Sequence, residues 1–171
     1  MIKAIDIYSR MEVKRLVQSA SIVPVTPLPF TWHLISVYTE PHAEMLVPES
    51  VIRLKQLGLD ESLSLRFSDI TDVADYERRK EEYPSYVNLF DTTHAQQVVD
   101  FLLRIQARPG PEVLFVHCDA GISRSGAIGT FARQLFNLDI EKFLRRNSQI
   151  LPNEYVLKLL HAELDSRGGA V

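Results

Sequence analysis

One stretch of fourteen residues, from Val113 to Gly126, limits what this chain can fold into more than any other part of it. It begins with a continuously apolar run, Val113 to Val116, that follows a Pro-Gly-Pro turn. Such a run is typical of a strand buried on both faces of a parallel sheet. A polar loop comes next, and apolar residues then recur at helical spacing from Ala127 to Phe136. The pattern predicts a strand, a short loop and a helix within an α/β domain.

The loop from Cys118 to Ser123 ends where that helix is expected to start. Inward-pointing backbone N–H groups, with about half a positive charge at the helix start, would make the loop a cradle for an anion. The same positive field favours the thiolate form of Cys118. Arg124 offers a planar fork that suits two oxygens of a phosphoryl group. Nucleophile, cradle and fork together indicate attack on a phosphate monoester.

Other residues of the stretch have expected supporting roles. Gly121 permits a backbone turn that a side chain would block. His117 can orient the loop by hydrogen bonding, and Ser125 can donate to the cysteine sulfur and ease its departure as a leaving group. Binding of the phosphoryl group is expected from the loop and the fork, namely Asp119, Ala120, Gly121, Ile122, Ser123 and Arg124.

The order His117-Cys118-Asp-Ala-Gly121-Ile-Ser-Arg124-Ser125 resembles the signature of the cysteine-based protein tyrosine phosphatases. Within that superfamily it is most similar to the dual-specificity and small bacterial members. The resemblance implies a cysteinyl-phosphate intermediate, no metal or other cofactor, and an aspartic acid on a separate loop that protonates the leaving oxygen. It also implies a single α/β domain with a central, mostly parallel sheet of four to five strands.

The rest of the chain alternates between strand and helix patterns, which predicts right-handed crossovers and helices on both faces of the sheet. Three further strands are expected over Ile2–Tyr8, His33–Tyr38 and Leu63–Ser68. Helices are expected over residues 11–16 with Ser9 as cap, over 49–57 between Pro48 and Gly58, from Asp91 to Ile105, after Asp139, and after Pro152-Asn153.

The general acid is expected at Asp69, which directly follows the predicted strand Leu63–Ser68. Parallel strands present their carboxyl ends at one rim of a sheet, so Asp69 should share the rim with the cysteine loop. Asp72 lies in the same loop and is the alternative acid, while Asp75 and Asp91 are further candidates. Aspartate is commonly a turn former or helix cap, and Asp91 is interpreted mainly as the cap of the next helix.

Two segments carry open interpretations. The mixed charges between Asp72 and Tyr86 predict a solvated helix, although Arg78, Arg79 or Lys80 could instead steer an acidic or phosphorylated substrate. Near the carboxyl terminus, the Pro-Asn before the last helix is similar to dual-specificity phosphatases. That resemblance gives Asn153 a role in holding the loop or the attacking water, but a helix cap explains it equally well.

Composition narrows the class of protein. A chain of 171 residues, 46% of them hydrophobic, suits one domain over residues 1–171. The net charge of −3 gives no electrostatic footprint for nucleic acid or an anionic membrane. A single cysteine excludes an intrachain disulfide and favours a reducing compartment. Without a signal peptide or a long apolar run, a cytoplasmic protein is expected; the oligomeric state stays open.

The expected substrate is a phosphorylated protein or peptide, most readily on tyrosine and also on serine or threonine. The variable loop positions lack the lysines that inositol-phosphate and RNA-triphosphate relatives use, and Asp119 adds a negative charge. Two alternatives remain: a phosphatase of a phosphorylated lipid, sugar or nucleotide, and a catalytically silent module that binds phosphoproteins.

Overall fold

Residues 1–19, 30–40, 46–85 and 87–168 are described by the structure, a computed structural model. In these residues four parallel strands form one sheet in the order β1-β4-β2-β3. The strands are β1 (Ile2–Ser9), β2 (Thr31–Tyr38), β3 (Leu59–Arg66) and β4 (Glu112–Cys118). The apolar run that predicts a buried strand lies in β4, between β1 and β2.

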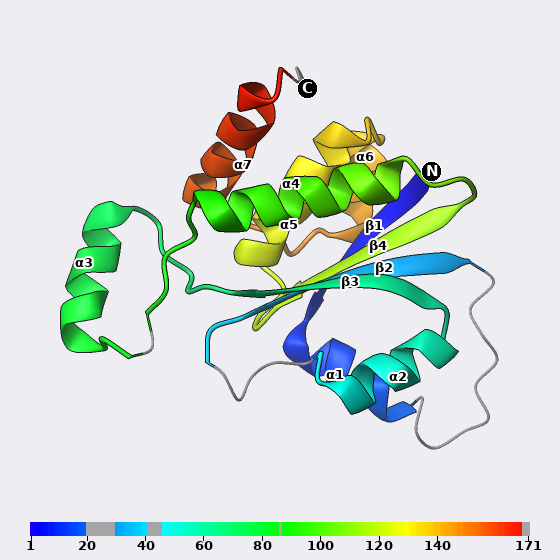
Figure 1. The fold of residues 1–171 in the computed structure, drawn as a ribbon, viewed down its shortest axis with the longest axis horizontal. Helices are drawn as coiled ribbons and strands as arrows, with labels where there is room; N and C mark the ends of the chain where they lie inside the picture. Colours follow the sequence, from blue (N-terminus) through cyan, green and yellow to red (C-terminus); the bar gives the residue numbers. More distant parts are fainter. Residues whose placement is uncertain (20–29, 41–45, 86, 169–171) are drawn as a thin grey trace.

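Helices cover both faces of the sheet, as Figure 1 shows. One face carries α1 (Arg10–Ser19) and α2 (Pro48–Gln56); the other carries α4 (Thr92–Gln106), α5 (Arg124–Leu135), α6 (Ile140–Arg146) and α7 (Glu154–Ser166). Each face has its own buried cluster: a smaller one around Trp32 and Phe115 under α1 and α2, and a larger one around Phe101 and Phe131 under the other helices. The predicted α/β class is therefore confirmed.

Capping residues fix where the helices begin and end. Ser9 and Glu12 bond reciprocally across the first turn of α1. Pro48 occupies the first turn of α2, and the chain leaves that helix at Gly58 with a φ of 98° that favours glycine. Asp91 and Asp139 accept backbone N–H groups at the starts of α4 and α6. These five predicted boundaries are confirmed to within a few residues.

The third strand differs from its prediction over Leu63–Ser68. It starts at Leu59, which pairs with Trp32 of β2. The charged residues Asp60 and Glu61, which pair with Arg108, hide this part of the strand in the sequence. It ends at Arg66, because the Ser68 N–H donates to the Asn88 carbonyl at 2.8 Å and turns the chain out of the sheet. Asp69 therefore lies on a short loop after the strand.

Helix α3 (Val73–Glu82) stands apart from both layers, beyond the carboxyl ends of the strands (Figure 1). As the mixed charges predict, it is largely exposed, and Asp75 is its one buried residue. The end of the predicted segment, Tyr86, lies outside the described residues. Within the described ranges, no helix is long and apolar enough to cross a membrane.

Candidate active site

The predicted nucleophile lies at the carboxyl end of the central sheet. Cys118 is the last residue of β4, and α5 begins six positions later at Arg124. The Cys118 side chain is buried, with its sulfur 3.1 Å from the Ser125 Oγ and 3.3 Å from the Gly121 nitrogen. The Gly121 N–H donates to the sulfur, and the Ser125 hydroxyl is placed to do so.

The turn of this loop depends on Gly121. Its φ is 73°, in the left-handed region. A Cβ atom there would lie 2.7 Å from the backbone of Tyr8 and Ser9 at the end of β1. Glycine is therefore required both by the backbone conformation and by the close approach of the neighbouring strand.

Arg124 is buried, and its guanidinium is fixed by three acceptors. One terminal nitrogen donates to the Thr39 Oγ1 at 2.9 Å and to the Phe67 carbonyl at 2.8 Å. The other donates to the Asp119 carboxylate at 2.6 Å. The Nε atom is buried and has no hydrogen-bond partner in the part of the chain that the structure describes. The arginine is thus held across the ends of β2 and β3, and its Nε–H is left for a ligand.

Asp119 occupies part of the fork that the sequence assigns to a phosphoryl group. Besides its bond to Arg124, the Asp119 carboxylate lies 3.6 Å from the Arg10 guanidinium, and the Asp119 carbonyl accepts from the Arg10 N–H. The side chain of Asp119 is thereby shared between α1 and the buried arginine. Asp119 therefore occupies a donor of Arg124, the arginine that the sequence assigns to binding a phosphoryl group.

Asp69, the predicted acid, is anchored by two donors that come from other parts of the chain. The Ser123 hydroxyl donates to its Oδ1 at 2.7 Å, and the Asn153 amide donates to the same oxygen at 2.8 Å. Asn153 also donates to the Ile70 carbonyl and accepts from the Val156 N–H as the cap of α7. The Asn153 side chain therefore caps α7 and also holds the loop that carries Asp69, so the two interpretations are compatible.

The other aspartates have structural partners. Asp72, the alternative acid, is exposed and accepts the Asp75 N–H as the cap of α3. Asp75 is buried and pairs with Arg78 at 2.5 Å and with Arg79 at 2.9 Å. Asp91 caps α4, as predicted.

A cavity of about 800 Å³ joins Asp69 and Arg124 to helix α3. Its remaining walls come from the ends of β2 and β3 and from α3 with the chain after it: Thr39, Glu40, Ser68, Arg78, Arg79, Glu82, Tyr83 and Val87. The acid and the arginine thus face one space, whereas Asp72 does not line it. Helix α3 is largely exposed to solvent, and it also forms one wall of this cavity through Arg78, Arg79 and Glu82.

His117 is fully buried beside the nucleophile. Burial lowers the pKa of His117 from 6.5 to about 4, so its ring is neutral near pH 7. Against the effect of burial, an interaction of the ring with the Cys118 backbone raises the pKa. The expected role of His117 in orienting the loop stays a prediction.

Sequence reasoning missed Thr39 and Arg10, which hold Arg124 and Asp119. Thr39 directly follows β2, and Asp69 closely follows β3. Because parallel strands present their carboxyl ends at one rim of a sheet, the sequence pattern that indicates Asp69 also indicates Thr39. For Arg10 there was no comparable signal, because it lies in the first turn of an ordinary amphipathic helix. In the described ranges no three histidine, cysteine or acidic side chains gather to hold a metal ion.

Comparison with known proteins supports the fold. No protein-family model matches the chain, and no curated protein matches it significantly. Two solved structures align with probability 1.00 at 20% identity: PTPMT1 in complex with PI(5)P, covering 97% of this chain and 95% of the other with a TM-score of 0.52, and PTPMT1 alone, covering 96% and 94% with 0.50. Tk-PTP in the active form aligns at 17% identity over 96% and 91%, with a TM-score of 0.47. Over nearly its whole length, the chain therefore shares the fold of the two PTPMT1 structures.

Proposed function

We propose that this protein is a cysteine-dependent phosphatase that hydrolyses phosphate monoesters of phosphoproteins, most readily phosphotyrosine. One observation carries the proposal: Arg124 and Asp69 line the same cavity, and the loop that starts at Cys118 holds both of them. A nucleophile, a cation and an acid are the groups that transfer of a phosphoryl group to a thiol requires.

In the first step the Cys118 thiolate attacks phosphorus in line with the leaving oxygen. The loop N–H groups and Arg124 stabilise the equatorial oxygens. As the P–O bond breaks, protonated Asp69 gives its proton to the departing alcohol or phenol. Ser123 and Asn153 both donate to Oδ1 of Asp69, which leaves its Oδ2 to carry that proton. The products are the free alcohol and a cysteinyl phosphate.

In the second step water attacks the phosphorus of the cysteinyl phosphate. Asp69, now a carboxylate, takes a proton from the water, and the P–S bond breaks to give inorganic phosphate and the thiolate. The Ser125 hydroxyl, 3.1 Å from the sulfur, is positioned to donate to the departing thiolate. No step of this cycle calls on a metal ion or an organic cofactor.

A phosphoprotein substrate is supported by the charges around the cavity. The side chains of Asp119, Ala120, Ile122 and Ser123 supply no cation beside Cys118. Asp119 already takes one arm of Arg124, which disfavours a second phosphate close to the first. Tyr83 and Val87 line the cavity and offer apolar surface to an aromatic ring.

A phosphorylated lipid headgroup is the second candidate. Arg78 and Arg79 line the same cavity as Arg124 and could bind a further anionic group. A protein of the same fold, PTPMT1, has been solved in complex with PI(5)P. Against this candidate, both arginines are already paired with Asp75.

The first test is hydrolysis of para-nitrophenyl phosphate without metal by the wild type, Cys118→Ser, Asp69→Asn and Asp72→Asn. We expect no activity from the cysteine variant, a loss of about 100-fold in kcat for Asp69→Asn, and near wild-type turnover for Asp72→Asn. An active wild type whose Asp72→Asn variant fails while Asp69→Asn works would overturn the assignment of the acid. A wild type that binds phosphopeptides yet never releases phosphate would instead make the protein a binding module.

The second test compares kcat/KM for phosphotyrosine peptides with that for PI(5)P. A higher value for the peptides supports the proposal. A higher value for PI(5)P that disappears in Arg78→Gln/Arg79→Gln would favour the lipid candidate.

A further inference from the structure

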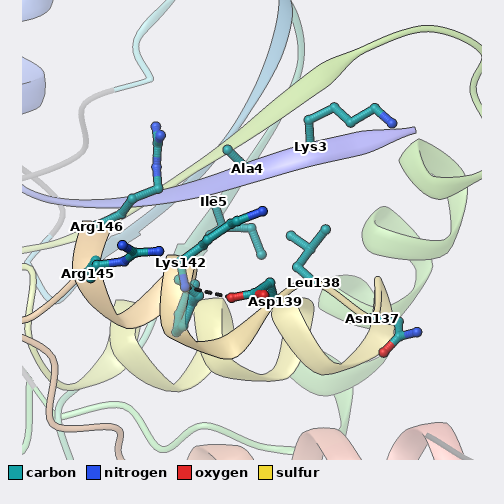
Figure 2. Close-up of a pocket in the computed structure, with 10 residues that line it drawn as sticks. Lys3, Ala4, Ile5, Asn137, Leu138, Asp139, Lys142, Arg145 and Arg146 are labelled. Atoms are coloured by element: carbon teal, nitrogen blue, oxygen red, sulfur yellow. Dashed lines mark hydrogen bonds between the residues drawn. The ribbon is translucent and has the colours of Figure 1, made fainter.

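A second cavity, of about 460 Å³, lies between the amino-terminal half of β1 and helix α6 (Figure 2). It is lined by Lys3, Ala4, Ile5, Asn137, Leu138, Asp139, Lys142, Phe143, Arg145 and Arg146. Because the catalytic loop follows the carboxyl end of β4, this groove lies toward the opposite end of the sheet. None of its residues takes part in the proposed chemistry.

The groove is strongly basic, although the chain as a whole has a net charge of −3. Four of its ten lining residues are lysine or arginine and one is acidic. That acidic residue, Asp139, caps α6 by accepting the Lys142 N–H at 2.8 Å, the bond dashed in Figure 2. The groove therefore attracts anions on an otherwise acidic protein.

Three of these cations are available to a partner. Lys3, Lys142 and Arg145 are exposed and form no salt bridge with acidic side chains in the described ranges. Arg146 is already engaged, since it donates two bonds of 2.6 Å to Asp6. Figure 2 shows Lys142 and Arg146 extending from α6 toward β1, with Arg145 on the same helix, while Lys3 extends from β1 itself.

The floor of the groove is apolar and follows an edge strand. Ile5 and Phe143 are buried in it, and Ala4 and Leu138 are half-buried. On the side away from β4, the backbone of Ile5 and Ile7 is bonded by Asn147. A cationic rim over an apolar floor suits a peptide with both acidic and apolar side chains.

A short segment of chain joins the groove to the catalytic loop. The chain after α6 follows β1, with Asn147 bonded to Ile5 and Ile7, and it then reaches the catalytic loop, where the Leu151 N–H donates to the Ile122 carbonyl. From Lys3 to Ser9 the strand rises about 20 Å. An extended peptide covers that distance in about six residues. One polypeptide could therefore reach both sites at once.

We propose that this groove docks an acidic segment of the phosphoprotein partner and so delivers the phosphorylated residue to Cys118. The identity of the partner as substrate rests on the function proposed above; the binding of an acidic peptide by the groove does not. Tethering at the groove would raise the effective concentration of the phosphorylated residue at the active site and lower KM, leaving kcat nearly unchanged.

The direct test is fluorescence anisotropy with a labelled Asp/Glu-rich peptide that carries no phosphate. We expect the wild type to bind it, with affinity falling as salt is raised. The double variant Lys142→Glu/Arg145→Glu should bind the peptide at least about tenfold more weakly. Lys14→Glu/Arg15→Glu, on exposed positions of α1, makes the same change in net charge and should bind normally.

The linked test uses phosphopeptides in which the same acidic segment is placed about ten residues from the phosphotyrosine or is replaced by a neutral one. The acidic segment should lower KM for the wild type and for the α1 variant, but not for Lys142→Glu/Arg145→Glu. Turnover of para-nitrophenyl phosphate should be the same in all three proteins.

Equal peptide binding by the groove variant and the α1 variant would overturn the docking proposal, as would binding to vesicles of anionic phospholipid in place of the peptide. A wild type that docks the peptide through the groove but hydrolyses no phosphate ester would overturn the proposed function and leave the groove assignment standing.

Discussion

The Asn153 amide donates to the Asp69 carboxylate at 2.8 Å while its own Oδ1 accepts the Val156 N–H at the start of α7. One side chain thus caps a helix and holds the proposed general acid. The two functions are separable by substitution, because a cap needs an acceptor and the acid needs a donor that reaches it.

Replacing Asn153 with Ser should lower kcat with little effect on stability. Serine caps helices about as well as asparagine, but its shorter side chain does not reach Asp69. We expect kcat for para-nitrophenyl phosphate to fall about tenfold, whereas Asn153→Ala should in addition lose about 1 kcal/mol of unfolding free energy. Steady-state kinetics and urea denaturation measure the two effects, and equal kcat in Asn153→Ser and wild type would exclude the link to the acid.

Replacing Asp119 with Asn should tighten substrate binding. The Asp119 carboxylate takes one arm of Arg124 at 2.6 Å, so a phosphoryl group must compete with it. A neutral amide binds the guanidinium less strongly, and we expect KM to fall about threefold with kcat nearly unchanged. Glu141→Gln, which removes one exposed negative charge on α6, is the control; an equal fall in its KM would assign the effect to net charge.

Replacing Thr39 with Val should weaken catalysis, whereas Thr39→Ser should preserve it. The Thr39 hydroxyl accepts from Arg124 at 2.9 Å, and valine keeps the shape of threonine without that acceptor. Removing one acceptor from a buried guanidinium costs about 1–3 kcal/mol, and we expect kcat/KM to fall about tenfold. Kinetics of the pair separate the hydrogen bond from side-chain volume; similar losses in both variants would contradict this account.

Gly121 and Gly110 provide a matched pair of glycine-to-alanine substitutions. Both have positive φ, but a Cβ at Gly121 would meet the backbone of Tyr8 and Ser9, whereas nothing lies within 4 Å at Gly110. We expect Gly121→Ala to lose about 3 kcal/mol of stability and most of its activity, and Gly110→Ala to lose about 1 kcal/mol and remain active. Thermal unfolding with activity assays tests this, and equal losses would refute the steric explanation.

Stability should decrease as the pH falls from about 6.5 to about 4. Burial lowers the pKa of His117 to about 4, so the unfolded chain, with a pKa near 6.5, takes up the proton first. His117 therefore contributes about 3 kcal/mol to the free energy of unfolding, and this contribution is fully present above pH 6.5 and is lost progressively down to pH 4. Burial also lowers the pKa of His33, which adds to the loss in the same direction. Urea unfolding of wild type and His117→Asn across this range should give a smaller slope for the variant; identical slopes would contradict it.

The local part of the site is readable from the sequence because its residues are close along the chain. Cys118, Gly121 and Ser125 lie within one strand-loop-helix unit, where the tight turn requires Gly121 and the proposed chemistry accounts for Cys118 and Ser125. Helix caps such as Asp91 and Asp139 are readable for the same reason, since a cap acts within its own first turn.

Tertiary structure alone decided the long-range part. Asp69 is joined to Ser123 across 54 positions and to Asn153 across 84, and Arg124 is joined to Thr39 across 85. The sequence favours Asp69 over Asp72 only by its place directly after a predicted strand, and the fold separates them, because Asp69 lines the cavity with Arg124 whereas Asp72 caps α3. The groove of Lys3 and Lys142 likewise exists only after β1 and α6 pack together. The sequence by itself therefore determines the proposed nucleophile and its loop through local geometry and favours Asp69 as the proposed acid by its place after a strand. The partners of that acid, the setting of the arginine and the basic groove depend on which strand ends and helices the fold brings together.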